Sequence, residues 1–369
     1  MSPPGPFYRP QLPKPSVYTG RGWRVCSEPL HLDAVSPTTF PRLALSRALA
    51  PSLIQRGVPP GQWSVRADTS DLAVALYVFA RYLGLACTVV FVFDGPLASN
   101  LKRKTIIAPI NDKVKKAFRK LIRAVGFHIF DAKGEADADL GRMSRYGFVN
   151  SVVSDDSDVF VFGAKTVIRM PNLEIDGENV HTFQAVDIRR HKEYGLDSVQ
   201  LILFAVLMGN DYDQDGVSGC GLQAALSLAR SYLATELIGI LDAAEAPEFW
   251  RRKDQFRAAM YDEIMHNTSR LLSHPLPHVA ENISPSFPNM DTVRLLARPI
   301  TSELWDIQAA SEDWNAQGID IGRLAELCVR YFSWDFDTVR SRFEEHLYWG
   351  ICIQYLMAVG AILITSRLS

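Results

Sequence analysis

Six acidic residues stand at points in the sequence where apolar strands end or helices begin. They fall in three blocks: VVFVFDG (89–95), GEADADL (134–140) with SVVSDDSDVFVFGA (151–164), and LMGNDYDQDGVSGCG (207–221). The acids are Asp94, Glu135, Asp137, Asp156, Asp158 and Asp211. Clustered carboxylates repel each other and lose hydration unless a cation neutralises them. The pattern therefore favours a fold that gathers these positions at one edge, with divalent metal ions among them.

The segments between these acids alternate between strand-like and helix-like patterns. Residues 87–93 form a continuous β-branched and aromatic run, which is typical of a strand buried on both faces of a parallel sheet. Residues 113–125 are amphipathic, with one apolar stripe and a basic opposite face. Further helices are predicted at 71–85, 135–146, 196–208 and 222–230, and strands at 127–130, 148–153, 159–162 and 166–169. This alternation predicts an α/β fold with a mostly parallel sheet flanked by helices.

The two ends of the chain have a different character. Twelve of the 21 prolines fall in the first 60 residues, where we predict irregular structure with a short strand near 29–33 and a helix around 43–55. Helical patterns dominate after residue 231. The predicted division is a proline-rich segment 1–65, a core 66–230 and a mainly helical region 231–369. The apolar run 349–364 is shorter than the roughly 20 residues of a membrane span, which favours a buried terminal helix and no membrane.

The charge distribution indicates a phosphate-rich partner. The net charge is only −2, but residues 102–123 hold nine Lys or Arg against one acid. A basic segment beside an acidic cluster suits a nucleic acid that approaches a metal site, although a solvated helix face gives the same pattern. The five cysteines are scattered and include no CxxC pair, so neither a disulfide framework nor a zinc site is indicated.

The spacing of the acids suits oxygen coordination of a hard cation. Asp156 and Asp158 are two residues apart after a strand, so both can reach one side of an extended chain. On a regular helix Glu135 shares a face with Asp139, so Asp137 can be a ligand only if the first turn is irregular. Carboxylates alone suit Mg²⁺ or Mn²⁺, and two such ions can assist phosphodiester hydrolysis. The competing interpretation is that each acid is a helix cap or a surface charge.

The third block supports a second kind of contact. Closely spaced glycines at 216–221 precede a helix, and such turns expose backbone N–H groups that can hold a phosphate oxygen. The same block matches the first half of a calcium-binding EF-hand loop, but Leu222 stands where the bidentate glutamate is required. Calcium binding of that kind is therefore not predicted.

Together these motifs resemble the XPG/flap-endonuclease family of structure-specific nucleases. FVFDG followed by LKR is similar to the end of the family's N-terminal nuclease region, and GEADADL with SDDSDVFVFGA is similar to its internal region. GNDYDQDGVSGCG resembles the segment that leads into a helix–two-turn–helix element. The resemblance covers residues 72–230 and extends weakly through 283–302 and 320–336, where it is closest to fungal members near the Holliday-junction-resolvase branch.

The resemblance implies a PIN-like (resolvase-like) nuclease core with a helix–two-turn–helix element, a helical C-terminal extension, and a magnesium-dependent endonuclease for flapped or branched DNA. It implies a nuclear protein of DNA repair or recombination that uses two ions, Mg²⁺ or Mn²⁺. The six acids would be the metal ligands, and Lys102 would contact the scissile phosphate. The implied nucleic-acid contacts are Lys102, Arg103, Lys113, Lys116, Arg119, Lys120, Gly219 and Gly221.

The N-terminus departs from the family pattern. Family members have an early strand that ends in an aspartate, as in VDAS, and no such motif is present here. Asp33 in LHLDAVS and Asp68 in VRADTS are the two candidates for this seventh acid. Leu97-Ala98 also replaces the prolines or arginine that follow FVFDG in the family. A catalytically impaired nucleic-acid-binding relative is therefore the alternative hypothesis.

Overall fold

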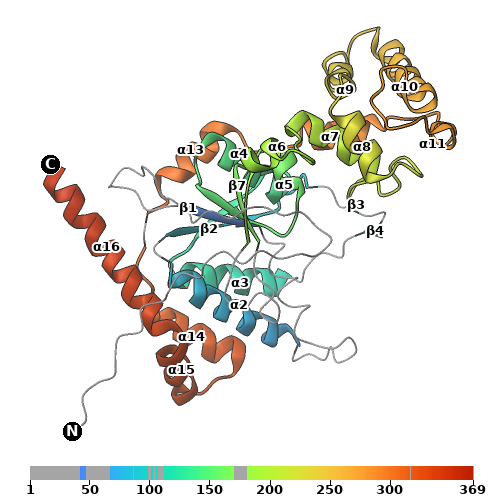
Figure 1. Cartoon of the computed structure of the whole chain (residues 1–369). Helices are drawn as coiled ribbons and strands as arrows, with labels where there is room; N and C mark the ends of the chain where they lie inside the picture. The colour runs from blue at the N-terminus through green and yellow to red at the C-terminus, as the bar shows by residue number, and fades with distance from the viewer. Residues whose placement is uncertain are drawn as a thin grey trace, which may run out of the picture.

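The computed structural model describes residues 42–46, 67–85, 87–98, 101–102, 105–106, 112–169, 181–315 and 317–368. Its centre is a six-stranded sheet with the strand order β5-β2-β1-β6-β7-β8 (Figure 1). The strands are β1 (Arg42–Ser46), β2 (Thr88–Phe93), β5 (His128–Asp131), β6 (Ser151–Val153), β7 (Thr166–Arg169) and β8 (His181–Gln184). All neighbouring pairs are parallel except β7 with β8. The predicted mostly parallel sheet is confirmed.

Strand β2 shows why both faces of this sheet are covered. Phe91 and Phe93 point into a cluster with helices α2 (Ala67–Leu83), α3 (Asp112–Ala124) and α14 (Ile321–Phe332). Val90 and Val92, one position out of phase, pack on the other face with α4 (Ala136–Tyr146) and Ile307 of α13 (Leu304–Glu312). Because successive residues of a strand face opposite sides, an unbroken apolar run needs two layers of helices. Figure 1 shows α2 and α3 on one side of the sheet and α4 and α13 on the other.

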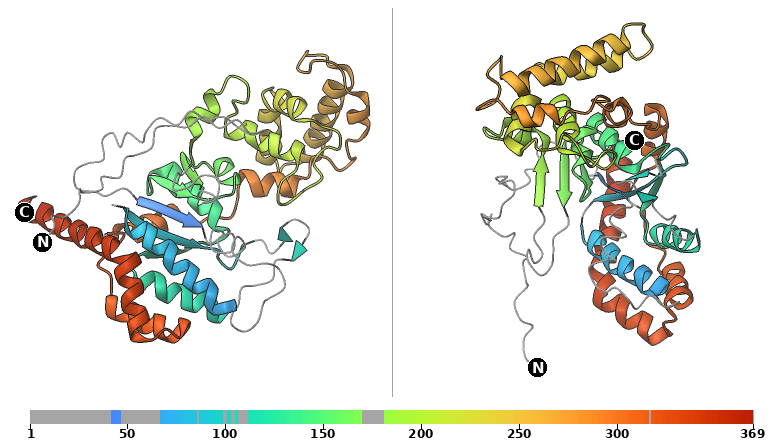
Figure 2. Two further views of the ribbon diagram at one scale, coloured as in Figure 1. Left: turned by 60° about the horizontal axis from the view of Figure 1, so that its bottom comes forward. Right: turned by 90° about the vertical axis from the view of Figure 1, so that its right-hand side faces the viewer.

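A second group of helices packs around its own core beyond the sheet. The group contains α7 (Ser198–Met208), α8 (Leu222–Ala229), α9 (Leu233–Asp242), α10 (Phe249–His266), α11 (Pro277–Glu281) and α12 (Met290–Ala297). Figure 2 shows this helical lobe set to one side of the sheet. Helix α7 begins at a capping box, in which the Asp197 carboxylate accepts from the N–H of Gln200 and the Gln200 side chain accepts from the N–H of Asp197. The proposed boundary at residue 230 falls inside this cluster.

The C-terminal helices return to the sheet. Helix α14 packs with α2 and α3, and α15 (Phe336–Arg342) and the π-helix η1 (Phe343–Leu347) continue that layer. The last element is α16 (Tyr348–Leu368), so the predicted terminal helix is confirmed. Its predicted burial is wrong for the described part, because Trp349 and Leu356 are 75% and 73% exposed. Only one stripe meets α2, where Gln354 donates to the carbonyl of Leu83 at 3.3 Å.

The apolar helices bear on whether the chain could span a membrane. Among the described residues, no single helix is long and apolar enough to cross a membrane. Helices α8 and α9 reach that length only as a pair bent by 63°. Both of these helices lie in the core of the helical lobe.

Two of the predicted elements are wrong in type. Residues 42–46 form the central strand β1, whereas we predicted a helix from residue 43; residues 47–55 of that helix and the strand predicted at 29–33 lie outside the described residues. Residues 159–162 were predicted as a strand, but Asp158–Val161 form the short helix α5. Short apolar runs suit a buried strand and a buried helix equally, so neighbouring contacts decide. Ahead of α5, the Asp156 carboxylate accepts from the N–H of Asp158 at 2.9 Å and closes a turn that starts the helix.

Candidate metal and nucleic-acid site

Asp94 lies at the carboxyl end of β2, where the sheet meets the start of α4. Its Oδ1 accepts from the N–H of Ala136, the first residue of α4, at 2.9 Å. The turn is tight: a Cβ at Gly95 would lie 1.8 Å from the carbonyl oxygen of Ala132, so only glycine fits. The carboxylate thus satisfies a helix N-terminal amide and remains exposed at the edge of the sheet.

Glu135 and Asp137 point to the same region because the helix starts between them. Glu135 is the N-cap residue of α4 and has an extended backbone, with φ −75° and ψ 138°. Its side chain therefore does not follow the helical spacing. Asp137 lies in the first turn and accepts from the Ser154 hydroxyl at 3.3 Å. Glu135 and Asp137 are only 9% and 8% exposed, and the irregular start of α4 is the condition under which Asp137 can be a ligand.

Asp139, in the same acidic block, is used by the fold. It is fully buried, and its carboxylate accepts from the backbone N–H and the hydroxyl of Ser302 at 2.8 and 2.6 Å. Burial raises the pKa of Asp139, and the Ser302 hydrogen bonds oppose that rise. The Ser302 hydroxyl also accepts from the N–H of Lys133 at 3.1 Å. Asp139 therefore fastens the segment before α13 to helix α4.

Asp156 and Asp158 follow β6 in a turn organised by one serine. The Ser154 oxygen accepts from the N–H of Asp156 at 3.1 Å while its hydroxyl donates to Asp137. Asp156 in turn accepts from the N–H of Asp158. Ser154 is fully buried, so it links the strand end to α4 out of reach of water.

Tyr212 joins the third acidic block to the first. Its hydroxyl donates to Glu135 Oε2 at 2.7 Å. The pKa of Tyr212 is raised, first by burial and then by the nearby carboxylates of Glu135, Asp158 and Asp156. The tyrosine is held by Asn210, whose side-chain oxygen accepts from the N–H groups of Tyr212 and Asp213. Glu135 thus accepts from the Tyr212 hydroxyl, and the half-exposed Asp211 precedes this tyrosine in the chain.

The donor atoms fit a hard divalent cation in kind, because all the predicted ligands are carboxylates. In the described part of the chain, no three His, Cys, Asp or Glu side chains lie close enough together to hold a metal ion. Like-charged carboxylates repel at short range, so a set of this kind closes fully only around a cation. The arrangement is an acidic edge held by hydrogen bonds to Ala136, Ser154 and Tyr212.

The basic residues of the predicted DNA-binding set differ in their exposure. Lys113, Lys116 and Lys120 have exposed positions along α3. Arg119 instead donates to both carboxylate oxygens of Asp131, at 2.5 and 2.6 Å, and its guanidinium lies 4.8 Å from the ring centre of Phe93. Lys102 is in the short strand β3 (Leu101–Lys102), paired with β4 (Thr105–Ile106), whereas Arg103 lies outside the described residues. Arg119 thus holds Asp131, whereas the exposed positions of Lys113, Lys116 and Lys120 suit contact with a phosphate backbone.

The glycine turn lies between α7 and α8, which pack against each other. Gly219 has a φ of +83°, and a Cβ there would lie 2.9 Å from His278 Nε2, so glycine is required. Gly221 is the N-cap residue of α8, and a Cβ at this position would meet open space. The backbone N–H groups at the start of α8 therefore border an open surface.

The central strand β1 has the sequence RLALS and contains no acid. Ser46 is the last residue of β1 and pairs with Val92, two residues before Asp94. Of the two candidates for the seventh acid, Asp33 lies outside the described residues, and Asp68 is the second residue of helix α2. Neither is therefore seen at the end of a strand.

Sequence reasoning missed three residues that organise the site: Ser154, Tyr212 and Ser302. Ser154 and Tyr212 stand beside predicted ligands within the quoted blocks, so their position was a usable signal. Ser302 is 163 residues from Asp139, and no local pattern relates the two.

The comparisons with known proteins agree with this geometry. Residues 126–211 match the model of the XPG I-region. The chain is 25% identical over 251 residues to the DNA excision repair protein ERCC-5 of Mus musculus, covering 68% of this chain and 19% of that protein. It is 32% identical over 120 residues to Flap endonuclease GEN-like 1 of Arabidopsis thaliana, covering 32% and 19%. The chain spans about a fifth of the length of these two curated relatives.

A solved structure extends the likeness beyond the I-region. The Holliday junction-resolving enzyme GEN1 in complex with product DNA and Mg²⁺ has a TM-score of 0.67 and 26% sequence identity, covering 85% of this chain and 71% of that one. The fold and its acidic edge thus define an α/β protein of the PIN-like nuclease class. Within that class the chain is similar to members of the XPG/flap-endonuclease family, and residues 126–211 match that family's I-region. The nearer kinship to fungal members remains a prediction.

Proposed function

We propose that this protein is a divalent-metal-dependent, structure-specific DNA endonuclease that hydrolyses a phosphodiester at flaps or branched junctions. The observation that carries the proposal is the hydrogen bond from the Tyr212 hydroxyl to Glu135, which joins the loop that holds Asp211 to the start of α4, together with the Ser154 contact to Asp137 beside Asp156. The acids Glu135, Asp137, Asp156 and Asp211 lie within the stretch 126–211 that matches the XPG I-region, and Tyr212 directly follows it. The relatives are named as flap or junction nucleases, and the GEN1 complex carries Mg²⁺.

The proposed ligands are Asp94, Glu135, Asp137, Asp156, Asp158 and Asp211, which would hold two ions of Mg²⁺ or Mn²⁺. Metal bound by such a set activates water and stabilises the leaving oxygen of a phosphodiester. Asp94 keeps the start of α4 at the edge of the sheet, and Ser154 and Tyr212 orient Asp137 and Glu135.

The proposed DNA contacts are made to the backbone. Lys102 would meet the phosphate at the cut, and Lys113, Lys116 and Lys120 would follow the strand. The backbone amides around Gly219 and Gly221 would bind the duplex at some distance from the cut. Such contacts position a substrate by charge and shape without reading its sequence. A nuclear role in DNA repair or recombination follows from the same kinship and remains part of the proposal.

A second function is favoured by one observation. The central strand β1 contains no acid, whereas the resemblance predicts an early strand that ends in an aspartate. A protein with this edge and without that acid would bind branched DNA and cut it poorly. The proposal and this alternative share the same DNA-binding surface and differ only in turnover.

A substrate panel separates the two functions. The protein is incubated with 5′-labelled flap DNA, four-way-junction DNA and single-stranded RNA in Mg²⁺ or Mn²⁺. The nuclease proposal predicts cutting of a branched DNA, lost in the Asp156→Asn/Asp158→Asn double variant with DNA binding retained. Binding without cutting by the unaltered protein establishes the alternative. Equal cutting by protein and double variant would reject the assigned acids, and Asp213→Asn, a neighbouring acid outside the predicted set, is the matched control.

A further inference from the structure

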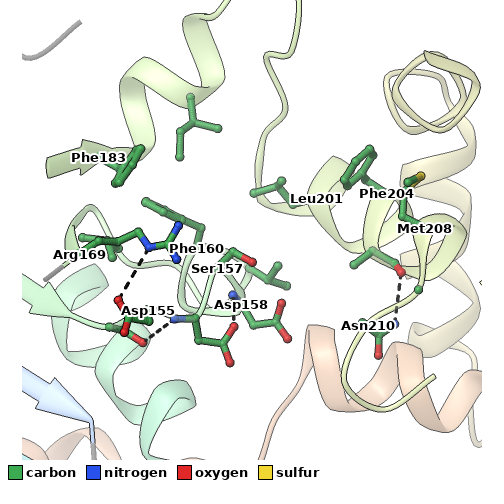
Figure 3. A pocket seen from close by; sticks show the side chains of 17 residues that line it. Asp155, Ser157, Asp158, Phe160, Arg169, Phe183, Leu201, Phe204, Met208 and Asn210 are labelled. Atoms are coloured by element: carbon green, nitrogen blue, oxygen red, sulfur yellow. Dashed lines mark hydrogen bonds and ion pairs between the residues drawn. The ribbon is translucent and has the colours of Figure 1, made fainter. Parts of the chain in front are cut away.

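A cavity of about 410 Å³ is lined on one side by the turn that holds Asp156 and Asp158. It opens between the sheet and the helical lobe: Phe160 of α5 and Phe183 of β8 stand on one side, and Leu201 and Phe204 of α7 on the other (Figure 3). The walls are mostly apolar, with three aromatic rings from three separate elements. Cavities of this size hold small flat ligands or parts of larger ones.

Carboxylates form one border of the cavity, and Asn210 lies on the opposite side, next to α7 (Figure 3). Asp155 and Asp158 stand at the acidic border, where Arg169 of β7 approaches Asp155 with an Nε–Oδ1 distance of 3.9 Å, and Asp156 also lines the cavity. Carboxylates at the border disfavour an anion inside the cavity and accept hydrogen bonds from amino groups. The chemistry suits an uncharged, flat group that offers N–H donors on its rim and an apolar face to the rings.

Two of the cavity residues are also predicted metal ligands. Asp156 and Asp158 line the cavity and belong to the acidic edge at which the proposed function places the reacting phosphate. A group that fills the cavity is then attached to the same nucleotide or to its neighbour. The base is the part of a nucleotide that is flat, uncharged and rich in N–H donors, and enzymes that unstack a base commonly place it between aromatic or apolar side chains.

We propose that this cavity binds one unpaired nucleobase of the strand that lies at the acidic edge, stacked against Phe183 or Phe204. The site rests on the proposed DNA-binding function and adds to it a contact with a base beside the cut. Stacking on an aromatic side chain tolerates every base, so the contact detects whether a base is unpaired and leaves sequence unread. It would favour DNA in which a nucleotide near the junction is free to leave the helix.

The test measures the binding of several altered DNA substrates to each of several cavity variants. Branched DNA carrying one abasic site, stepped through the first three nucleotides on each side of the junction, is titrated with EDTA present so that no strand is cut. The protein variants are Phe183→Leu and Phe204→Leu, which remove a ring and keep an apolar side chain. Phe249→Leu, at a half-buried ring outside the cavity, is the control. Thermal unfolding checks that each variant is folded.

The expected result is a loss of roughly tenfold in affinity at one abasic position with unaltered protein, on the scale of one stacked base. The same abasic site lowers the DNA affinity of at least one cavity variant by less than about twofold, whereas it lowers the affinity of the control variant as much as that of the unaltered protein. Equal penalties in all proteins at every position overturn the cavity as a base site. Cutting of flap DNA without any position-specific penalty overturns only this inference, and binding without cutting removes only the nuclease activity. No binding to any branched DNA overturns both.

Discussion

The stretch 126–211 and the central strand β1 contribute to the same edge of the sheet in opposite ways. The first supplies four acids whose directions are set by specific contacts: the N-cap position of Glu135, the Ser154 bond to Asp137 and the turn through Asp156 to Asp158. The second lies between β2 and β6 and ends in Ser46. A sheet can therefore retain its order of strands while one strand contributes no charge to the edge.

The difference teaches that packing and chemistry are separable at this site. Strand β1 needs only to pair with β2 and β6, and a small polar residue at its end leaves those hydrogen bonds unchanged. A metal site needs a carboxylate at a particular place. The family's fold is thus confirmed, while its full set of acids stays a prediction that experiments on both regions can test.

The largest expected effect comes from restoring an acid to β1. If Ser46 stands where the family's aspartate belongs, Ser46→Asp raises Mg²⁺-dependent cleavage of branched DNA by more than roughly 100-fold, because a metal ligand should matter more than the groups that orient one, whose effects are roughly 10- to 100-fold. Ser46→Asn, of equal size and without charge, leaves cleavage unchanged. The measurement is single-turnover cleavage over a series of Mg²⁺ concentrations.

Two further variants locate the acid if it comes from elsewhere. Asp33→Asn and Asp68→Asn are assayed beside Ser46→Asp. Suppose that the unaltered protein cuts DNA, that one of these two Asn variants does not, and that Ser46→Asp brings no gain. The seventh acid is then the aspartate whose replacement abolished cutting. That outcome contradicts the assignment of Ser46.

A smaller effect is expected from the hydroxyl that connects Asp211's loop to α4. Tyr212→Phe keeps the ring and removes the 2.7 Å hydrogen bond to Glu135. We expect a loss of roughly 10- to 100-fold in cleavage and a higher Mg²⁺ requirement, because partners that orient metal ligands have effects of this size. DNA binding measured in EDTA should stay within about twofold, since the tyrosine faces the acids and not the basic helix.

Tyr261→Phe is the matched control for this change, since Tyr261 is 40% exposed on α10 and lies outside the acidic edge. A Tyr212→Phe variant with unaltered rate and metal requirement would show that the hydrogen bond only supports the fold. Lower thermal stability without a kinetic change would lead to the same conclusion.

An element could be predicted from the sequence where the residues that determine it lie within the same segment. The run 87–93 and the amphipathic residues 113–125 gave correct elements because their periodicity is fixed by their own burial. Residues 159–162 were assigned wrongly because side-chain bonds from Ser154 and Asp156 start a helical turn there. The end of β1 could not be recognised, since the leucine- and alanine-rich run LALSRALA (43–50) resembles a helix as much as a strand.

At the candidate site, the same limit separates the acids from their partners. Asp94 and Glu135 were identified by their place at element ends, whereas the bond between Asp139 and Ser302 joins distant segments. Asp131 shows the converse. It ends β5 at the same edge as the predicted ligands, but Arg119 neutralises it, and only the three-dimensional contact reveals this.

The smallest expected effect tests that contrast between a neutralised acid and the acidic edge. The hydrogen bonds and charge of Arg119 lower the pKa of Asp131 in the folded protein. The pair's stabilisation is therefore fully present above the unfolded-state pKa of about 3.9 and is lost as pH falls through the lower folded-state value. In Asp131→Asn this part of the pH dependence disappears, whereas the loss of stability at pH 7 is at most about 1 kcal/mol, because the carboxylate is largely exposed to solvent. Urea unfolding at pH 3 and pH 7 measures both quantities, and cleavage of branched DNA should be unchanged. A loss of cleavage as large as that of the Asp156→Asn/Asp158→Asn variant would place Asp131 among the working acids and remove the distinction.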